Sequence, residues 1–247
     1  MFRDLIPFLA KDFYVVAPDF PGFGQTKAPG RDEFEYSFEH IAQIIDKFVE
    51  TIGLARYALY VFDYGAPIGF RLAMRHPERI MAIVSQNGNA YREGLGKKWA
   101  EREKYWAAPT PEGRKKFSIA YAPETIIGQY TFGTQDGTVA PDGYTLDMAY
   151  MSLPGRSEIQ DDLILDYRTN VALYPEFQKY LRENQPPLLA VWGQNDPSFI
   201  SAGAEAFKKD VPEAEIHFVD SGHFALESHA EDIASIMITF LKKHLNQ

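Results

Sequence analysis

Residues 57–70 read YALYVFDYGAPIGF, and this stretch decides the fold. Its first six residues are apolar without a break, which predicts a buried strand at 57–62. A helical pattern follows at once and ends near Pro77. Asp63 stands at the junction, where a sharp turn from strand into helix needs a small residue just beyond it, and Gly65 supplies one. The stretch therefore predicts a strand, a tight turn and a helix, with a carboxylate at the carboxyl end of the strand.

The same alternation of apolar strands and amphipathic helices recurs before and after this unit. We expect further strands at 13–17, 80–84, 188–192 and 215–219, and helices at 38–52, at 202–209 and at the C-terminus through 233–241. Strands that are apolar throughout and separated by helices are typical of a parallel sheet with both faces covered. The sequence therefore predicts the α/β class.

Residues 90–185 have a different composition, because they are rich in aromatic and charged residues, Pro and Gly and contain no strand of this kind. At Pro186 the first pattern returns. We therefore expect an α/β core made of residues 1–89 and 186–247, interrupted by a separate unit at 90–185.

Composition limits the function further. The chain has 247 residues, a formal net charge of −9 and no cysteine. An acidic chain without a basic cluster is a poor nucleic-acid binder, and without cysteine it has no disulfide, thiolate metal site or cysteine nucleophile. No apolar run approaches the roughly 20 residues of a membrane span. We expect a cytoplasmic protein with neither nucleic acid nor membrane as a partner, and no spacing of histidines suggests a metal.

Two further polar residues follow later strands. Asp196 comes after the strand at 188–192, and His223 comes after the strand at 215–219. Taken singly, Asp196 is an ordinary turn residue before a proline, His223 an ordinary loop histidine, and Asp63 an ordinary helix cap. Their order, however, is that of a hydrolase triad on this topology, with nucleophile, acid and histidine each at the carboxyl end of a strand.

Four motifs in this order resemble the α/β-hydrolase superfamily, and specifically its branch with an aspartate nucleophile, which contains epoxide hydrolases and haloalkane dehalogenases. They are VAPDFPGFG at 16–24, VFDYGAPIG at 61–69, WGQNDP at 192–197 and SGHF at 221–224. The resemblance implies a mostly parallel sheet flanked by helices, and it implies that residues 90–185 form the family's inserted helical cap. It implies no cofactor.

The chemistry that this resemblance implies is consistent with the residues present. No Gly-x-Ser-x-Gly occurs, so a serine esterase would lack its nucleophile. A carboxylate such as Asp63 is ionised at pH 7 and attacks a saturated carbon without help from a base, which gives an alkyl ester of the enzyme. His223, oriented by Asp196, then activates the water that hydrolyses this ester.

The leaving group separates the possible substrates. An opening epoxide benefits from a tyrosine donor, with a pKa near 10, whereas a halide needs only N–H or ring-edge donors. Haloalkane dehalogenases usually carry Trp after the nucleophile, and this chain has Tyr64. Tyr167, in DYRTN at 166–170, resembles the proton-donating tyrosine of epoxide hydrolases; the alternative is that it only packs between cap and core. Tyr105 and Trp106 are weaker candidates for the substrate pocket, with core packing as the alternative.

Related fluoroacetate dehalogenases share the Tyr-Arg stretch, but they generally carry Arg beside the elbow glycine, where this chain has Tyr64 and Ala66. Family members also normally begin with two or three further strands and a His-Gly-x-Pro loop that supplies an oxyanion donor. This chain has no His-Gly pair, so if it is complete its sheet lacks one edge and the reaction lacks a donor, a loss of about 10²- to 10³-fold in rate.

Three functions follow, in order of preference. The first is hydrolysis of a small or medium apolar epoxide to a diol, the second is a haloalkane or haloacid dehalogenase, and the third is a catalytically weak or dead ligand-binding fold.

Overall fold

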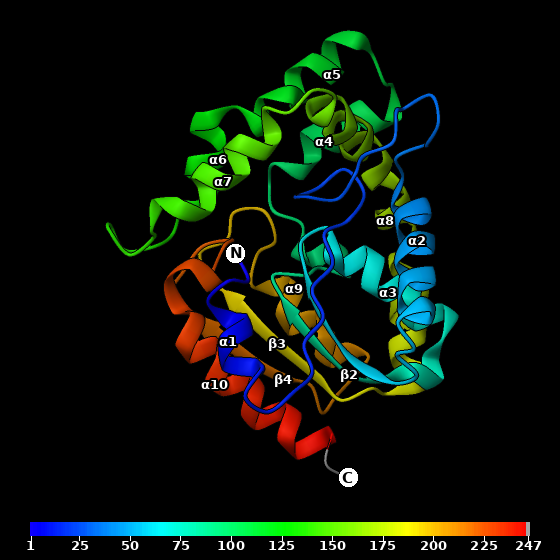
Figure 1. The fold of residues 1–247 in the computed structure, drawn as a ribbon, viewed down its shortest axis with the longest axis vertical. Helices are drawn as coiled ribbons and strands as arrows, with labels where there is room; N and C mark the ends of the chain where they lie inside the picture. The colour runs from blue at the N-terminus through cyan, green and yellow to red at the C-terminus, as the bar shows by residue number, and fades with distance from the viewer. Residues whose placement is uncertain (246–247) are drawn as a thin grey trace.

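Four parallel strands form one sheet in the computed structural model, which describes residues 1–245 (Figure 1). They are β1 (Tyr57–Phe62), β2 (Ile80–Gln86), β3 (Leu188–Gly193) and β4 (Glu215–Val219), paired in the order β1-β2-β3-β4. Every pairing is parallel, so the carboxyl ends of all four strands lie at one edge of the sheet. The prediction of the α/β class is confirmed.

Helices cover both faces of this sheet. The larger apolar cluster contains residues of α2 (Phe38–Thr51) and α3 (Gly65–Arg75), whereas the smaller contains residues of α1 (Leu5–Leu9) and α10 (Leu226–Leu245). Successive residues of β2 alternate between the two clusters, with Ile83 in the first and Ala82 and Val84 in the second. This alternation explains the unbroken apolar runs, because successive side chains of a strand point to opposite faces and both are buried.

The expected strand at 13–17 is wrong, because residues 14–20 have no regular secondary structure. A strand must pair its N–H and C=O groups with a neighbour, and the sheet order leaves this segment without one. Phe13 and Val15 instead pack against the apolar cluster beneath α1 and α10, while Tyr14 is 87% exposed. The aromatic and β-branched residues at 13–17 therefore indicate that one side of this segment is buried, and not that it forms a strand of the sheet.

The other predicted elements are confirmed with small differences. β1 and β4 have the expected bounds, and β2 extends two residues further than predicted, to Gln86. The helical stretch at 202–209 divides into α9 (Ala202–Ala206) and a short 3-10 turn. The C-terminal helix contains a break at His229, whose backbone is not helical.

Helices and loops, with no strand, make up the described chain between β2 and β3. The helices are α4 (Trp99–Ala107), α5 (Pro111–Phe117), α6 (Pro123–Thr131), α7 (Pro141–Met151) and α8 (Arg156–Asn184). In Figure 1, α4 to α7 occupy the upper end of the molecule, and α8 runs down from them beside α2 and α3. In the lower part of α8, the Phe177 ring stacks on Phe70 of α3 at 5.3 Å between ring centroids. The long helix α8 therefore packs with both the upper helices and the α/β core.

None of the helices in residues 1–245 combines the length and the apolar character needed to cross a membrane.

Candidate active site

Asp63 occupies a strained turn between β1 and α3. Its φ of 41° lies in the left-handed region, which a residue with a Cβ rarely adopts, and the strand and the helix on either side hold it there. Its backbone oxygen accepts a hydrogen bond from the amide of Ala66 at 3.0 Å. The side chain does not cap the helix, since α3 has Tyr64 at its N-cap with no side-chain capping bond. The carboxylate, 31% exposed, is left to make other contacts.

The small residue that this unit requires is not the one predicted. A Cβ added to Gly65 would meet no atom within 4 Å, so the turn does not exclude a side chain there. A Cβ added to Gly69, by contrast, would lie 2.4 Å from Cγ1 of Val61. Gly69 is therefore the residue that lets α3 pack closely on β1, and the space at Gly65, beside the candidate nucleophile, is open.

The three residues of the predicted triad lie in contact. His223 Nε2 is 2.8 Å from Asp63 Oδ2, and His223 Nδ1 is 2.6 Å from Asp196 Oδ2. Asp63 follows β1, Asp196 follows β3 and His223 follows β4. The parallel sheet therefore brings together residues that lie up to 160 positions apart. His223 and Asp196 are buried, and Asp63 is partly exposed. The arrangement has the geometry of nucleophile, base and orienting acid.

Asn87 is a member of the site that the sequence did not reveal. It follows β2 with a φ of 45°, and its Nδ2 donates to Asp196 Oδ2 at 2.9 Å. Its Oδ1 accepts from the amide of Gly193 at 2.9 Å, so the side chain fixes both the acid and the end of β3. The amide of Ser198 donates to the other carboxylate oxygen of Asp196 at 2.7 Å. Burial alone would raise the pKa of Asp196, but His223 and these donors outweigh it and lower that pKa.

The imidazole of His223 lies among the rings of Phe62, Phe199 and Phe224, with centroids 4.7, 5.9 and 5.1 Å away. Burial disfavours its charged form, but the carboxylates of Asp196 and Asp63 outweigh burial and raise the pKa of His223 to about 9. In the free protein at pH 7, His223 is therefore protonated and forms an ion pair with both carboxylates.

The candidate donors Tyr64 and Tyr167 face each other next to the candidate nucleophile. Their ring centroids are 5.8 Å apart, and Phe38 packs edge-on against both. Burial raises the pKa of each hydroxyl, so both are protonated at neutral pH. The backbone N–H groups of Tyr64 and Gly65 lie at the start of α3, where an α-helix leaves its donors unpaired.

The two weaker candidates for the substrate pocket, Tyr105 and Trp106, contact different neighbours. The Trp106 ring lies parallel to that of Tyr167, with centroids 6.2 Å apart, so it belongs to the same aromatic group. Tyr105 packs on Phe117 at 5.2 Å and against Gly113 of α5. The structure therefore brings Trp106, but not Tyr105, against the candidate donor. Trp99, which the sequence did not single out, lies closer still to Tyr167, at 4.7 Å.

The motif around Tyr167 attaches α8 to the core. Asp166 Oδ2 accepts a hydrogen bond from the amide of Phe38 at 2.8 Å, at the start of α2. Asn170 Oδ1 accepts from Arg71 Nη1 of α3 at 2.7 Å. Both Arg71 and Asn170 are buried. Residues on either side of Tyr167 therefore fix this part of α8 to α2 and to α3.

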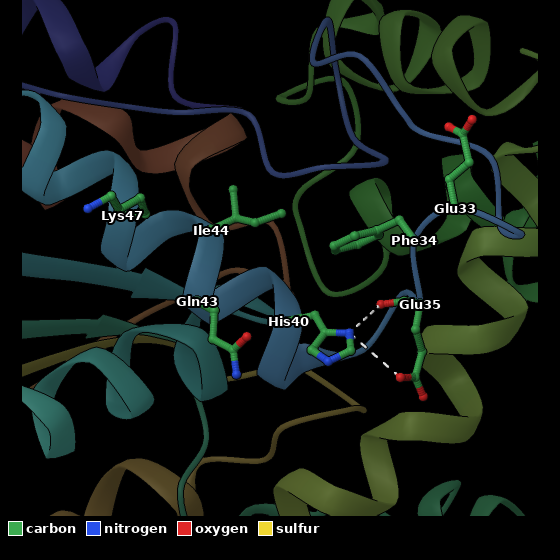
Figure 2. A pocket seen from close by; sticks show the side chains of 7 residues that line it. All are labelled: Glu33, Phe34, Glu35, His40, Gln43, Ile44 and Lys47. Atoms are coloured by element: carbon green, nitrogen blue, oxygen red, sulfur yellow. Dashed lines mark hydrogen bonds and ion pairs between the residues drawn. The ribbon is translucent and has the colours of Figure 1, made fainter.

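A surface hollow of about 390 Å³ lies elsewhere, along α2 (Figure 2). His40 lines it, and His40 Nδ1 is 3.0 Å from the backbone oxygen of Glu35 in the preceding loop. None of the predicted site residues lines this hollow. Within residues 1–245 no group of three or more His, Cys, Asp or Glu side chains is arranged to hold a metal.

Comparison with known proteins agrees with this fold. The family model of the alpha/beta hydrolase fold matches residues 1–122 and 134–230, and the chain belongs to this family of hydrolases.

Individual relatives are described as hydrolases or dehalogenases. An uncharacterized hydrolase of Saccharomyces cerevisiae is 43% identical over 249 residues, covering 99% of this chain and 85% of that protein. A haloalkane dehalogenase of Psychrobacter cryohalolentis is 22% identical, covering 98% of this chain and 78% of the relative. A solved structure from Pseudomonas aeruginosa, provisionally described as an epoxide hydrolase, has a TM-score of 0.79 at 20% identity and covers 99% of this chain and 85% of its own. The structural likeness shows the fold.

Proposed function

We propose that this hydrolase opens a small apolar epoxide to a diol through an ester on Asp63. The observation that carries the proposal is the contact of a strand-end carboxylate with a histidine that a second, buried carboxylate orients. We propose further that α4 to α8 act as the cap over the site, because Tyr167 of α8 packs beside Tyr64, and Trp99 and Trp106 of α4 pack on Tyr167.

In the first step a carboxylate oxygen of Asp63 attacks an epoxide carbon. The carbon–oxygen bond of the ring breaks, and the oxygen that leaves takes the proton of Tyr167. The protein is then an alkyl ester at Asp63 with a phenolate at Tyr167. The open space at Gly65, next to Asp63, leaves room for a substrate carbon.

After alkylation removes the negative charge of Asp63, His223 loses its proton to solvent. In the second step the neutral His223 removes a proton from water, and the oxygen attacks the carbonyl carbon of the ester. The N–H groups at the start of α3, which follows Asp63 directly, are the proposed donors to the negative oxygen that forms. The bond between the carbonyl carbon and the alkyl oxygen then breaks, and that oxygen takes the proton from His223. The diol leaves and Asp63 is left as a carboxylic acid. It passes its proton to His223, which restores the ion pair, and Tyr167 regains a proton from solvent.

The tryptophans favour an epoxide over a halide. The chain contains three tryptophans, and each indole N–H already donates to a backbone oxygen: Trp99 to Ser198, Trp106 to Ile164 and Trp192 to Phe199, at 2.7 to 2.9 Å. A halide is held by N–H or ring-edge donors, and none of these indole N–H groups is free to serve as one, whereas an opening epoxide needs a hydroxyl that donates its proton. The buried hydroxyls of Tyr64 and Tyr167 hold their protons at neutral pH, so each has a proton to donate.

The proposal is tested by turnover. Purified protein is incubated with a panel of aliphatic and aryl epoxides and with a matched panel of haloalkanes, and diol and free halide are quantified. We expect diol from epoxides and no halide, and we expect an Asp63→Ala variant to form neither product. Halide release without diol would make the protein a dehalogenase. A folded protein that converts no substrate would contradict both enzymatic functions and favour a ligand-binding role.

A further inference from the structure

A second buried tyrosine lies beside the proposed donor. Tyr174 follows Tyr167 by seven residues, or two helical turns, so both side chains lie on one face of α8. Their hydroxyl oxygens are 3.4 Å apart. Burial raises the pKa of Tyr174 to about 12, so it holds its proton throughout the neutral range. The two hydroxyls are therefore able to form one directed hydrogen bond.

Asn89 sets the direction of this hydrogen bond. Its Nδ2 donates to the Tyr174 hydroxyl oxygen at 3.2 Å and to the backbone oxygen of Tyr91 at 2.7 Å. Its Oδ1 accepts from the amide of Tyr91 at 3.3 Å, which fixes which end of the amide faces Tyr174. Because an amide nitrogen only donates, the oxygen of Tyr174 is the acceptor in this contact. The proton of Tyr174 is left to point toward the oxygen of Tyr167.

The side chain of Asn89 is held firmly. It is fully buried, and two glycines from different parts of the chain, Gly94 and Gly203, pack closely against its oxygen. A Cβ added to Gly94 would lie 2.0 Å from Asn89 Oδ1, and one added to Gly203, in α9, would lie 2.6 Å away. The site therefore admits the amide only because these two neighbours have no side chain.

We propose that Tyr174 is a positioning residue that Asn89 orients and that in turn orients the hydroxyl of Tyr167. With its oxygen engaged by Tyr174, Tyr167 directs its own proton toward the epoxide oxygen. When Tyr167 gives up that proton, the hydrogen bond from Tyr174 stabilises the phenolate. Tyr174 itself touches no substrate. This role rests on the proposed function, since it requires that Tyr167 donates a proton.

A double-mutant cycle with Tyr174→Phe and Tyr167→Phe tests this role. We measure the rate of ester formation by rapid quenching with a reactive epoxide. Loss of one hydrogen bond predicts a rate about 3- to 10-fold lower for Tyr174→Phe in the wild-type background and no further loss in the Tyr167→Phe background.

Two further variants make the test specific. Tyr180→Phe removes a hydroxyl from a buried tyrosine nearer the C-terminal end of α8, and its rate should equal that of wild type. Asn89→Ala acts through Tyr174, so it should lower the rate about 2- to 5-fold in the wild-type background and leave the Tyr174→Phe rate unchanged. If Tyr174→Phe does not fold, the pair Asn89→Ala and Tyr167→Phe gives the same test.

Two outcomes would overturn the role and are distinguishable. If wild-type protein forms the ester and Tyr174→Phe does not change the rate, Tyr174 is excluded as a positioning residue and the proposed function stays intact. The same holds if Tyr174→Phe lowers the rate equally in the wild-type and Tyr167→Phe backgrounds. A wild-type protein that forms no ester with any epoxide would overturn the proposed function, and the role of Tyr174 with it.

Discussion

His223 binds its proton more tightly than an ordinary histidine because two carboxylates flank its ring. This suits the resting protein, but the base of the second step must be neutral. In the proposed mechanism the change comes from the reaction itself, since alkylation removes the negative charge of Asp63. One of the two groups that raise the pKa of His223 is then lost, so that pKa falls below its value of about 9 in the free protein.

This gives a prediction for pH dependence. The rate of ester hydrolysis should rise with pH through the pKa of His223 in the alkylated protein, with a midpoint below about 9. The free protein, followed by NMR of the imidazole, should titrate at higher pH than this midpoint. Ester decay is measured after a single alkylation across pH 5 to 10. A midpoint equal to or above that of the free protein would contradict the coupling between Asp63 and His223.

Single residues differ in how far the sequence revealed them. Asp63, Asp196 and His223 were predictable because a polar residue at a strand's carboxyl end is conspicuous after an apolar run. Asn87 and Asn89 stand in the same kind of place, after β2, but an amide has a function only through its partners, and these lie on other strands and on α8.

Neighbouring aromatic residues of α4 are equally instructive. Tyr105 and Trp106 are adjacent in sequence, yet they lie on different sides of the helix and contact different neighbours. Weak helical periodicity in this segment gave no means to tell which one faces Tyr167.

At the scale of elements, the contact between β1 and α3 depends on one glycine. Gly69→Ala should lower the free energy of unfolding by about 1 to 3 kcal/mol, because its Cβ would overlap Val61. Gly65→Ala is the matched control in the same helix, and it should change stability by less than about 1 kcal/mol because its Cβ meets open space. Chemical denaturation of both variants measures the difference; equal losses would contradict the packing described.

The contact between α3 and α8 depends on the hydrogen bond from Arg71 to Asn170. Arg71→Met keeps the apolar stem but leaves Asn170 Oδ1 buried without its donor, which should cost about 1 to 3 kcal/mol of stability. Arg75→Met, one turn further along α3, removes a more exposed ion pair with the same partner, Glu39, and should cost less than about 1 kcal/mol. Thermal unfolding compares the two, and an equal or larger cost for Arg75→Met would contradict a role for Arg71 in holding α8.

The elements themselves were largely predictable, since hydrophobic period and helix ends are local. The segment 13–17 shows the limit of such signals. Its residues favour a strand, but strand formation also needs a neighbour with free backbone groups, and no local pattern tells whether one is present.

At the scale of the whole molecule, α8 joins the upper helices to the sheet. Its upper part carries Tyr167 among the rings of α4, and its lower part packs Phe177 and Leu181 into the core around α2 and α3. The expected boundary at residue 185 follows the end of this helix, so the sequence could place where the composition changes but not how one helix serves both parts.

This sharing predicts one cooperative unfolding transition. Near-ultraviolet dichroism, which reports the aromatic group around Tyr167, and far-ultraviolet dichroism, which reports all helices, should change at the same temperature. A calorimetric enthalpy equal to the van't Hoff enthalpy would agree. Two separate transitions would show that the helices between β2 and β3 unfold independently and would contradict the packing of α8.

The central claim is that Asp63 forms an ester that His223 is needed to hydrolyse. The most direct measurement is the mass of a His223→Gln variant after incubation with an epoxide, followed by peptide mapping. We expect the mass to increase by that of one epoxide, with the adduct on Asp63, and we expect no adduct when Asp63→Ala is combined with His223→Gln. A folded His223→Gln variant that stays unmodified, or that carries the adduct on another residue, would contradict the account.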